Sequence, residues 1–164
     1  ATTEIYTLSL HDALPICMHE NEKDIYGDVL SRCVDLMQTL NSAHFKSAFD
    51  FANFVQCGED TAKCWDALRP YIVYIHIKDA VSTDKENVLC GTGEGKIPEL
   101  LHKAIVEEGY TGFLTLEPHL VLFDSLQSLE TTDAKNIIRE NKYKNGAEGY
   151  AAQYHALCDI LAKF

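Results

Sequence analysis

The run from Tyr71 to Asp79, Tyr-Ile-Val-Tyr-Ile-His-Ile-Lys-Asp, constrains the fold more than any other stretch of the chain. Its near-continuous apolar start is rich in β-branched and aromatic residues, which predicts a strand that is buried on both faces. Strands of this kind belong to parallel sheets that are covered by helices. The polar residues stand at the C-terminal end, where parallel α/β folds place their functional side chains. His76 is therefore the first candidate for a functional residue.

The same unit recurs along the chain. Four strands are predicted: one of which residues 17–19 are the last part, and three that span 45–51, 71–77 and 112–118. Each strand is followed by a stretch in which apolar residues recur at helical spacing. These stretches are 30–40, 60–68, 97–108 and the segment from about Ala147. Alternating strands and helices predict βαβ units, and hence a parallel sheet with right-handed crossovers. Loops are expected around Asn53 and over residues 80–88. The expected buried stripe of the last helix is Ala151, Tyr154, Leu157, Cys158 and Leu161.

Length and composition narrow the class of protein. A chain of 164 residues is one domain by length, and its net charge of −11 argues against nucleic acid or an anionic membrane as a main partner. No stretch has the length of a transmembrane helix or the pattern of a signal peptide. The six cysteines include no CxxC pair, so a reducing cytoplasm without a disulfide framework is expected.

Residues 1–16 need a separate interpretation. They match the translation of a common sequencing-library adapter at all sixteen positions, whereas a natural strand followed by a Leu-Pro turn is the less favoured alternative. We therefore expect 1–16 to be a non-native segment that packs loosely, although residues 5–10 alternate enough to resemble a stray strand. Residues 17–164 then form the native part, and the start of the natural protein is missing.

Each of the four predicted strands ends in a residue suited to metal or proton chemistry, namely Glu20, Asp50, His76 and Glu117. The C-terminal ends of parallel strands lie at one edge of the sheet, so these side chains should converge. Three carboxylates and one imidazole favour a hard divalent ion such as Mn²⁺, Mg²⁺, Co²⁺ or Zn²⁺, held at roughly 2.0–2.3 Å. Glu22 competes with Glu20 as the first ligand, and Glu20 is preferred because it directly follows the strand-like residues.

Several ordered motifs together resemble the sugar phosphate isomerase/epimerase family, the xylose isomerase-like TIM barrels that are also related to endonuclease IV. The resemblance covers about residues 17–125. The motifs are His19-Glu20-Asn21-Glu22, Phe49-Asp50-Phe51-Ala52-Asn53, His76-Ile77-Lys78-Asp79-Ala80, Gly93-Glu94-Gly95 and Leu116-Glu117-Pro118-His119.

The resemblance implies an α/β fold that is the C-terminal half of a (β/α)8 barrel, with about four parallel strands and a barrel that is not closed. It implies a divalent metal ion held by Glu20, Asp50, His76 and Glu117, with Glu20 and Glu117 also acting as the acid/base pair. The expected activity is isomerisation or epimerisation of a sugar or sugar phosphate, by proton transfer next to a metal-polarised carbonyl. The intact protein could form a homo-oligomer.

The substrate contacts depart from the family's pattern. The keto-sugar epimerases have a histidine where this chain has Asn53 and an arginine where it has Ser82, so the substrate stays open. Asn53, Lys78 and His119 are candidate substrate contacts. For Lys78 and His119, a solvated loop residue is an equally weighted alternative. The Gly91–Gly95 turn lacks the Lys-Ser/Thr pair of a P-loop and does not directly follow a strand, so it fits the family's loop after strand seven of the barrel.

Two rival functions remain open from sequence. One is a polyol dehydratase or metal-dependent hydrolase on the same barrel, and the other is a non-catalytic sugar-binding barrel. An open half-barrel should also expose the surface meant for its other half, with Phe49, Val73, Ile75 and Leu114 as the candidates. The 164-residue chain should therefore be inactive on its own and prone to associate.

Overall fold

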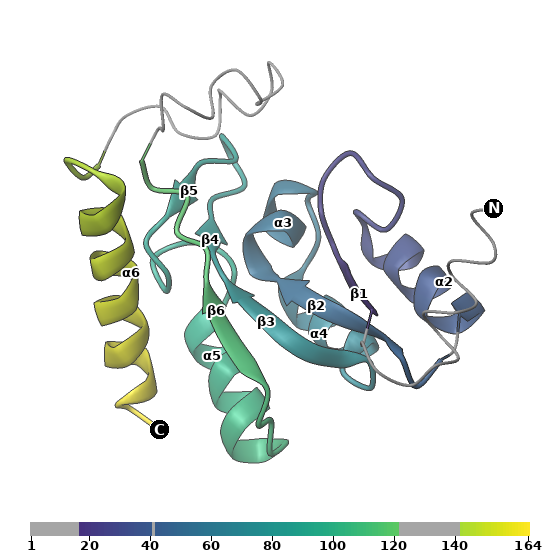
Figure 1. Cartoon of the computed structure of the whole chain (residues 1–164). Coiled ribbons are helices and arrows are strands. Elements are labelled where there is room, and N and C mark those ends of the chain that lie inside the picture. The colour runs from purple at the N-terminus through teal and green to yellow at the C-terminus, as the bar shows by residue number, and fades with distance from the viewer. Residues whose placement is uncertain (1–16, 41, 122–141) are drawn as a thin grey trace.

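The computed structural model describes residues 17–40, 42–121 and 142–164. Four parallel strands form one sheet in the spatial order β1 (Cys17–Glu20), β2 (Phe45–Asp50), β3 (Ile72–Ile77) and β6 (Phe113–Leu116). The α/β class and the open, parallel half-barrel predicted from the sequence are thereby confirmed (Figure 1). The adapter-like segment 1–16, with its stray strand, and most of the arm after Pro118 lie outside the described residues.

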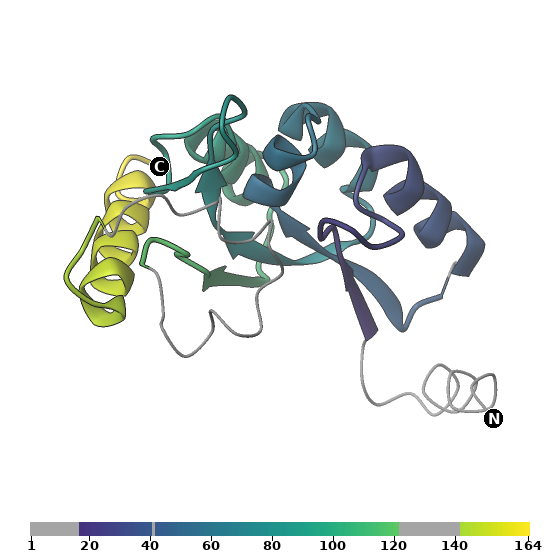
Figure 2. The same ribbon diagram turned by 90° about the horizontal axis from the view of Figure 1, so that it is seen from above.

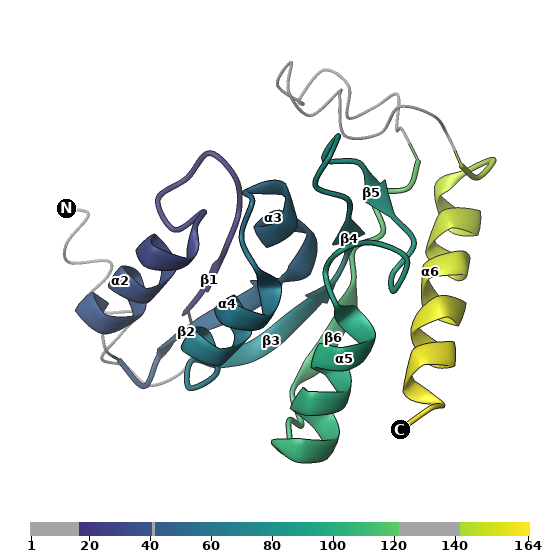
Figure 3. The same ribbon diagram turned by 180° about the vertical axis from the view of Figure 1, so that it is seen from behind.

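One face of the sheet is covered by helices, as the view from behind shows (Figure 3). These are α2 (Leu30–Leu40), α4 (Thr61–Leu68) and α5 (Ile97–His102), the last continuing as the π-helical turn η1 (Lys103–Glu107). Helix α6 (Gly146–Leu161) packs beside α5 and β6. Among the described residues, no helix is long and apolar enough to cross a membrane.

Strand register decides which side chains face these helices. Phe49 stands opposite Ile75, and Ile75 stands opposite Leu114, so the three share one face of the sheet. Phe49 and Ile75 are fully buried in the helix-covered core, where the Phe49 ring meets the Trp65 ring at 5.3 Å. The expectation that Phe49 and Ile75 line an exposed inner surface is therefore wrong. Leu114 also packs against this core, although it is only partly buried.

The opposite face carries the alternate residues, and no helix of the described ranges covers it (Figure 2). Met18 and Phe113 are exposed there by 43% and 73%, and Tyr74 lies between them, half-buried. Strand β3 is thus buried on its helix side only, rather than on both faces. The outer edges of β1 and β6 pair with no other strand among residues 17–40, 42–121 and 142–164. In a closed barrel, the face of the sheet that carries Met18, Tyr74 and Phe113 would line the interior.

Three local expectations are corrected by the structure. Asn53 lies on a short helix, α3 (Phe51–Gln56), rather than in a loop, because the Asp50 side chain caps that helix by accepting the Asn53 N–H. The segment after Lys78 includes two short antiparallel strands, β4 (Asp79–Ala80) and β5 (Asn87–Val88). In α6 the buried residues are Gly149, Gln153, Leu157 and Ile160, so only Leu157 of the expected stripe is buried.

Candidate metal centre

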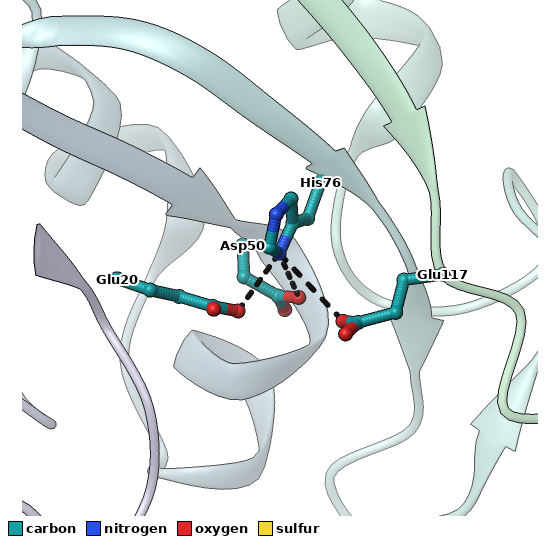
Figure 4. Close-up of side chains that lie close together, drawn as sticks. All are labelled: Glu20, Asp50, His76 and Glu117. Atoms are coloured by element: carbon teal, nitrogen blue, oxygen red, sulfur yellow. Dashed lines mark hydrogen bonds and ion pairs between the residues drawn. The ribbon is translucent and has the colours of Figure 1, made fainter. Parts of the chain in front are cut away.

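Strand register brings the four candidate ligands to one edge of the open face. Asp50 stands opposite His76, and His76 stands opposite Thr115, two residues before Glu117. Glu20 ends β1 on the same face, because its register partner Ala48 precedes Asp50 by two residues. Figure 4 shows the three carboxylates pointing toward the His76 ring from these neighbouring strands.

The four side chains form a compact cluster. One ligand atom from each of Glu20, Asp50, His76 and Glu117 lies within 4.8 Å of the other three. His76 Nδ1 is at the centre, 2.8 Å from Glu20 Oε1, 3.8 Å from Asp50 Oδ2 and 3.7 Å from Glu117 Oε2. An atom placed among them could contact three oxygens and one nitrogen, which is a donor set for a hard divalent ion.

Asp50 is the most buried member of the cluster and is held by its neighbours. Its backbone N–H donates to Asn21 Oδ1 and its carbonyl accepts from Asn21 Nδ2, both at 2.9 Å, which ties the ends of β1 and β2 together. Its Oδ1 caps α3, as described above. Its Oδ2 is buried and has no hydrogen-bond partner. A buried carboxylate oxygen without a donor is costly, and a bound cation would satisfy it.

Lys78 lies inside the cluster, two residues beyond His76 on the same face. Its side chain is only 5% exposed, and Nζ is 3.0 Å from Glu117 Oε2 and 3.4 Å from Asp50 Oδ2. Lys78 is therefore not a solvated loop residue. His119 is half exposed, and its Nε2 is 3.6 Å from Glu117 Oε1.

Asn53 is buried beside the first glutamate. Its Nδ2 donates to Glu20 Oε1 and Glu22 Oε2, both at 3.3 Å, and its Oδ1 accepts from Lys23 Nζ at 3.1 Å. Glu22 forms an ion pair with Lys23 at 3.2 Å. Glu22 is thus engaged outside the cluster of four, which leaves Glu20 as the carboxylate next to His76.

The electrostatics of the cluster follow from these contacts. The hydrogen bond to Glu20 raises the pKa of His76, against the effect of its partial burial. Burial raises the pKa of Asp50, and the nearby Lys78 only partly offsets this. Burial would also raise the pKa of Glu117, but His119 and Lys78 outweigh it and hold that pKa well below its usual range. The pKa values of Asp50 and Glu117 are thus shifted in opposite directions.

Sequence reasoning missed the role of Asp79. Its buried carboxylate accepts backbone N–H groups from Gly91 and Gly93 on Oδ2 and from Gly95 and Ala80 on Oδ1, at 2.9 to 3.0 Å. Asp79 thereby folds the glycine-rich loop back onto the end of β3. The signal in the sequence was the pairing of an aspartate directly after the His-Ile-Lys run with three glycines at alternate positions.

We expect Gly93→Ala to destabilise the fold by about 1–3 kcal/mol, the usual cost of forcing extra atoms into a packed site. A Cβ at Gly93 would come within 2.4 Å of Asp79 Oδ1 and 2.5 Å of the Ala80 carbonyl oxygen. Urea unfolding measures the change. Gly58→Ala is the control, because no atom lies within 4 Å of its Cβ and only its positive φ opposes substitution. A Gly93→Ala variant no less stable than Gly58→Ala would contradict the close packing.

Comparison with solved structures reveals the same half of a barrel in several proteins. A xylose isomerase domain protein from Planctomyces limnophilus matches with a TM-score of 0.62 and 18% identity, over 99% of this chain and 50% of that one. A D-tagatose 3-epimerase-like protein matches with a TM-score of 0.60 and 17% identity, over 99% and 54%. D-psicose 3-epimerase from Clostridium cellulolyticum H10 matches with a TM-score of 0.63 and 14% identity, over 88% and 48%.

The chain spans about half the length of the solved structures it matches. No family model and no curated protein matches the sequence. At these identities the likeness establishes the fold, and the predicted resemblance to xylose isomerase-like barrels is confirmed at that level.

Proposed function

We propose that the chain is the C-terminal half of a divalent-metal-dependent isomerase or epimerase of sugars or sugar phosphates. The observation that carries the proposal is the convergence of Glu20, Asp50, His76 and Glu117 within 4.8 Å at the C-terminal edge of a parallel half-barrel. That edge is where barrels of this architecture hold their active sites. Solved proteins with this fold include a D-tagatose 3-epimerase-like protein and a D-psicose 3-epimerase, which supports the choice of reaction class.

The cluster fits a divalent ion in charge as well as in donor type. The carboxylates of Glu20, Asp50 and Glu117, together with the ammonium of Lys78, leave two negative charges in a largely buried site when His76 is neutral. Clustered carboxylates without a compensating cation repel one another. One divalent ion would offset this negative charge and contact Asp50 Oδ2, which has no hydrogen-bond partner and only the Lys78 ammonium beside it, at 3.4 Å.

The two glutamates come from the outer strands of the sheet. Glu20 ends β1 and Glu117 follows β6, with the Asp50 and His76 strands between them. A bound metal ion would polarise a carbonyl and hydroxyl pair of the substrate. Glu20 and Glu117 would then reach the adjacent carbon from two sides, one removing its proton and the other supplying a proton to the opposite side. This arrangement suits an epimerisation, in which a carbon changes its configuration.

Lys78, Asn53 and His119 are the proposed substrate contacts. Lys78 and His119 both lie against Glu117, where they would face a sugar oxygen next to the reacting carbon. Asn53 contacts Glu20 on the other side. Because all three touch a proposed base without belonging to the set of four ligands, substitution of Asn53 should alter substrate choice more than it alters metal binding.

We expect the 164-residue chain to bind one Mn²⁺ ion, and Asp50→Ala to weaken that binding by about tenfold or more, because a buried ligand oxygen is lost. Isothermal titration calorimetry measures both affinities. Glu107→Gln is the matched control, since this carboxylate is exposed on η1 and pairs only with His102 among the described residues. Equal affinities of Asp50→Ala and Glu107→Gln would contradict the proposed centre.

Product analysis on a panel of ketoses, sugar phosphates and cyclic polyols tests the reaction class, using the intact protein loaded with Mn²⁺. An epimer or isomer of the substrate supports the proposal. Loss of water would assign a dehydratase, bond hydrolysis would assign a hydrolase, and tight sugar binding without turnover would assign a non-catalytic barrel.

A further inference from the structure

Lys78 uses the same oxygens that a metal ion would need. Its ammonium lies 3.0 Å from Glu117 Oε2 and 3.4 Å from Asp50 Oδ2. These two oxygens are also the ones that face His76 Nδ1, at 3.7 and 3.8 Å. An ion placed between the imidazole and these carboxylates would therefore contact the same two oxygens that the ammonium contacts.

The burial of Lys78 makes this overlap consequential. A lysine side chain that is 5% exposed needs anionic partners, and its ion-pair partners in the described part of the chain are Asp50 and Glu117. Two cations on the same two oxygens repel each other, most strongly beside the fully buried Asp50. The ammonium and the ion cannot both hold their best positions.

The position of Lys78 on the strand gives the displaced ammonium somewhere to go. Lys78 follows His76 by two residues and so lies on the same open face, just beyond the end of β3. A lysine side chain is long and flexible, and its ammonium can move while its stem stays packed. Movement away from Asp50 and Glu117 would leave their shared oxygens to the ion.

We propose that Lys78 is an internal counter-ion that takes the place of the metal in the metal-free site and is displaced from Asp50 and Glu117 when a divalent ion binds. This inference rests on the metal centre proposed above and deepens it. The affinity for the metal is then set by competition with a residue of the chain itself. Displacement also takes the ammonium away from Glu117, whose Oε2 it contacts at 3.0 Å in the metal-free chain.

The test is Mn²⁺ affinity of the 164-residue chain, measured by electron paramagnetic resonance of free Mn²⁺, in the wild type and in Lys78→Met. The uncharged methionine side chain cannot compete with the ion, so Lys78→Met should bind Mn²⁺ at least about tenfold more tightly than the wild type does. The metal-free variant should melt at a lower temperature than the wild type, because its carboxylates lose their counter-ion, and Mn²⁺ should raise its melting temperature more than that of the wild type.

Two further variants separate charge from shape. Lys78→Gln removes the charge but keeps a hydrogen-bond donor for Glu117, so it should bind Mn²⁺ more tightly as well, even if Lys78→Met does not fold. Lys103→Met is the control, because this lysine pairs with Asp66 and Glu108 away from the cluster, and its affinity should equal that of the wild type.

Each outcome decides between the two proposals. If the wild type binds Mn²⁺ and both Lys78→Met and Lys78→Gln bind it equally well or more weakly, the counter-ion role is wrong. The metal centre is then still supported. Absence of Mn²⁺ binding by the wild type and all variants would overturn the metal centre, and this inference with it.

Discussion

Glu117→Gln should abolish proton exchange at the substrate carbon in the intact protein, lowering it by about 100-fold or more, the usual contribution of a positioned acid or base. An amide can neither take nor give that proton. In the metal-free chain His119 and Lys78 hold the pKa of Glu117 below its usual range, so the carboxylate is ionised there at neutral pH. Incorporation of deuterium from solvent into the product is the measurement.

The control must separate chemistry from metal binding. Glutamine retains one ligand oxygen, so Glu117→Gln should still bind Mn²⁺, although more weakly, and exchange is therefore compared at saturating metal. Glu107→Gln, on the exposed side of η1, should exchange at the wild-type rate. Undiminished exchange in Glu117→Gln at saturating Mn²⁺ would exclude Glu117 as the base.

The sheet and the convergence of the site could be predicted because they depend on strand ends. Strand-like stretches, of which the one before His76 is the most apolar, end at Glu20, Asp50, His76 and Glu117. In a parallel sheet these ends must meet at one edge, whatever the details of the packing. The prediction needed no knowledge of which face of each strand the helices cover.

The apolar residues Tyr71–Ile75 by themselves do not decide which face of the strand the helices cover. With apolar residues at odd and even positions alike, neither parity stands out, and the assignment of Phe49 and Ile75 to the open face was wrong. The polar residue His76 carried the missing information, because its ring must reach the cluster and so Ile75 must face the helices. The prediction of the buried stripe in the last helix was also wrong in its choice of face, since Gln153 is buried and Tyr154 is exposed.

Contacts between distant segments were also beyond sequence reasoning. Asn53 was expected in a loop, but Asp50 caps a helix that presents it to Glu20. Lys78 was weighed between a solvated residue and a substrate contact, whereas it lies buried against Asp50 and Glu117. Both depend on side chains from separate strands meeting at one point, which spacing along a single element cannot reveal.

The 164-residue chain should self-associate in solution and show no turnover on its own. Its open sheet face exposes Met18 and Phe113 at the two outer strands, and neither edge is paired within the described residues. Phe113→Lys should reduce association, because a charge on an edge strand opposes pairing with another chain. Val106→Lys is the control, since Val106 is also exposed but lies on η1, away from the open face.

Sedimentation velocity measures the association, and a sugar panel with Mn²⁺ measures turnover. The expected result is a concentration-dependent mixture of oligomers for the wild type and for Val106→Lys, and a shift toward monomer for Phe113→Lys. A half-barrel supplies only half of the strand ends that surround a barrel's active site, so metal binding alone should not give activity. A wild-type chain that stays monomeric at high concentration, or that turns over a sugar, would mean that the half-barrel is self-sufficient.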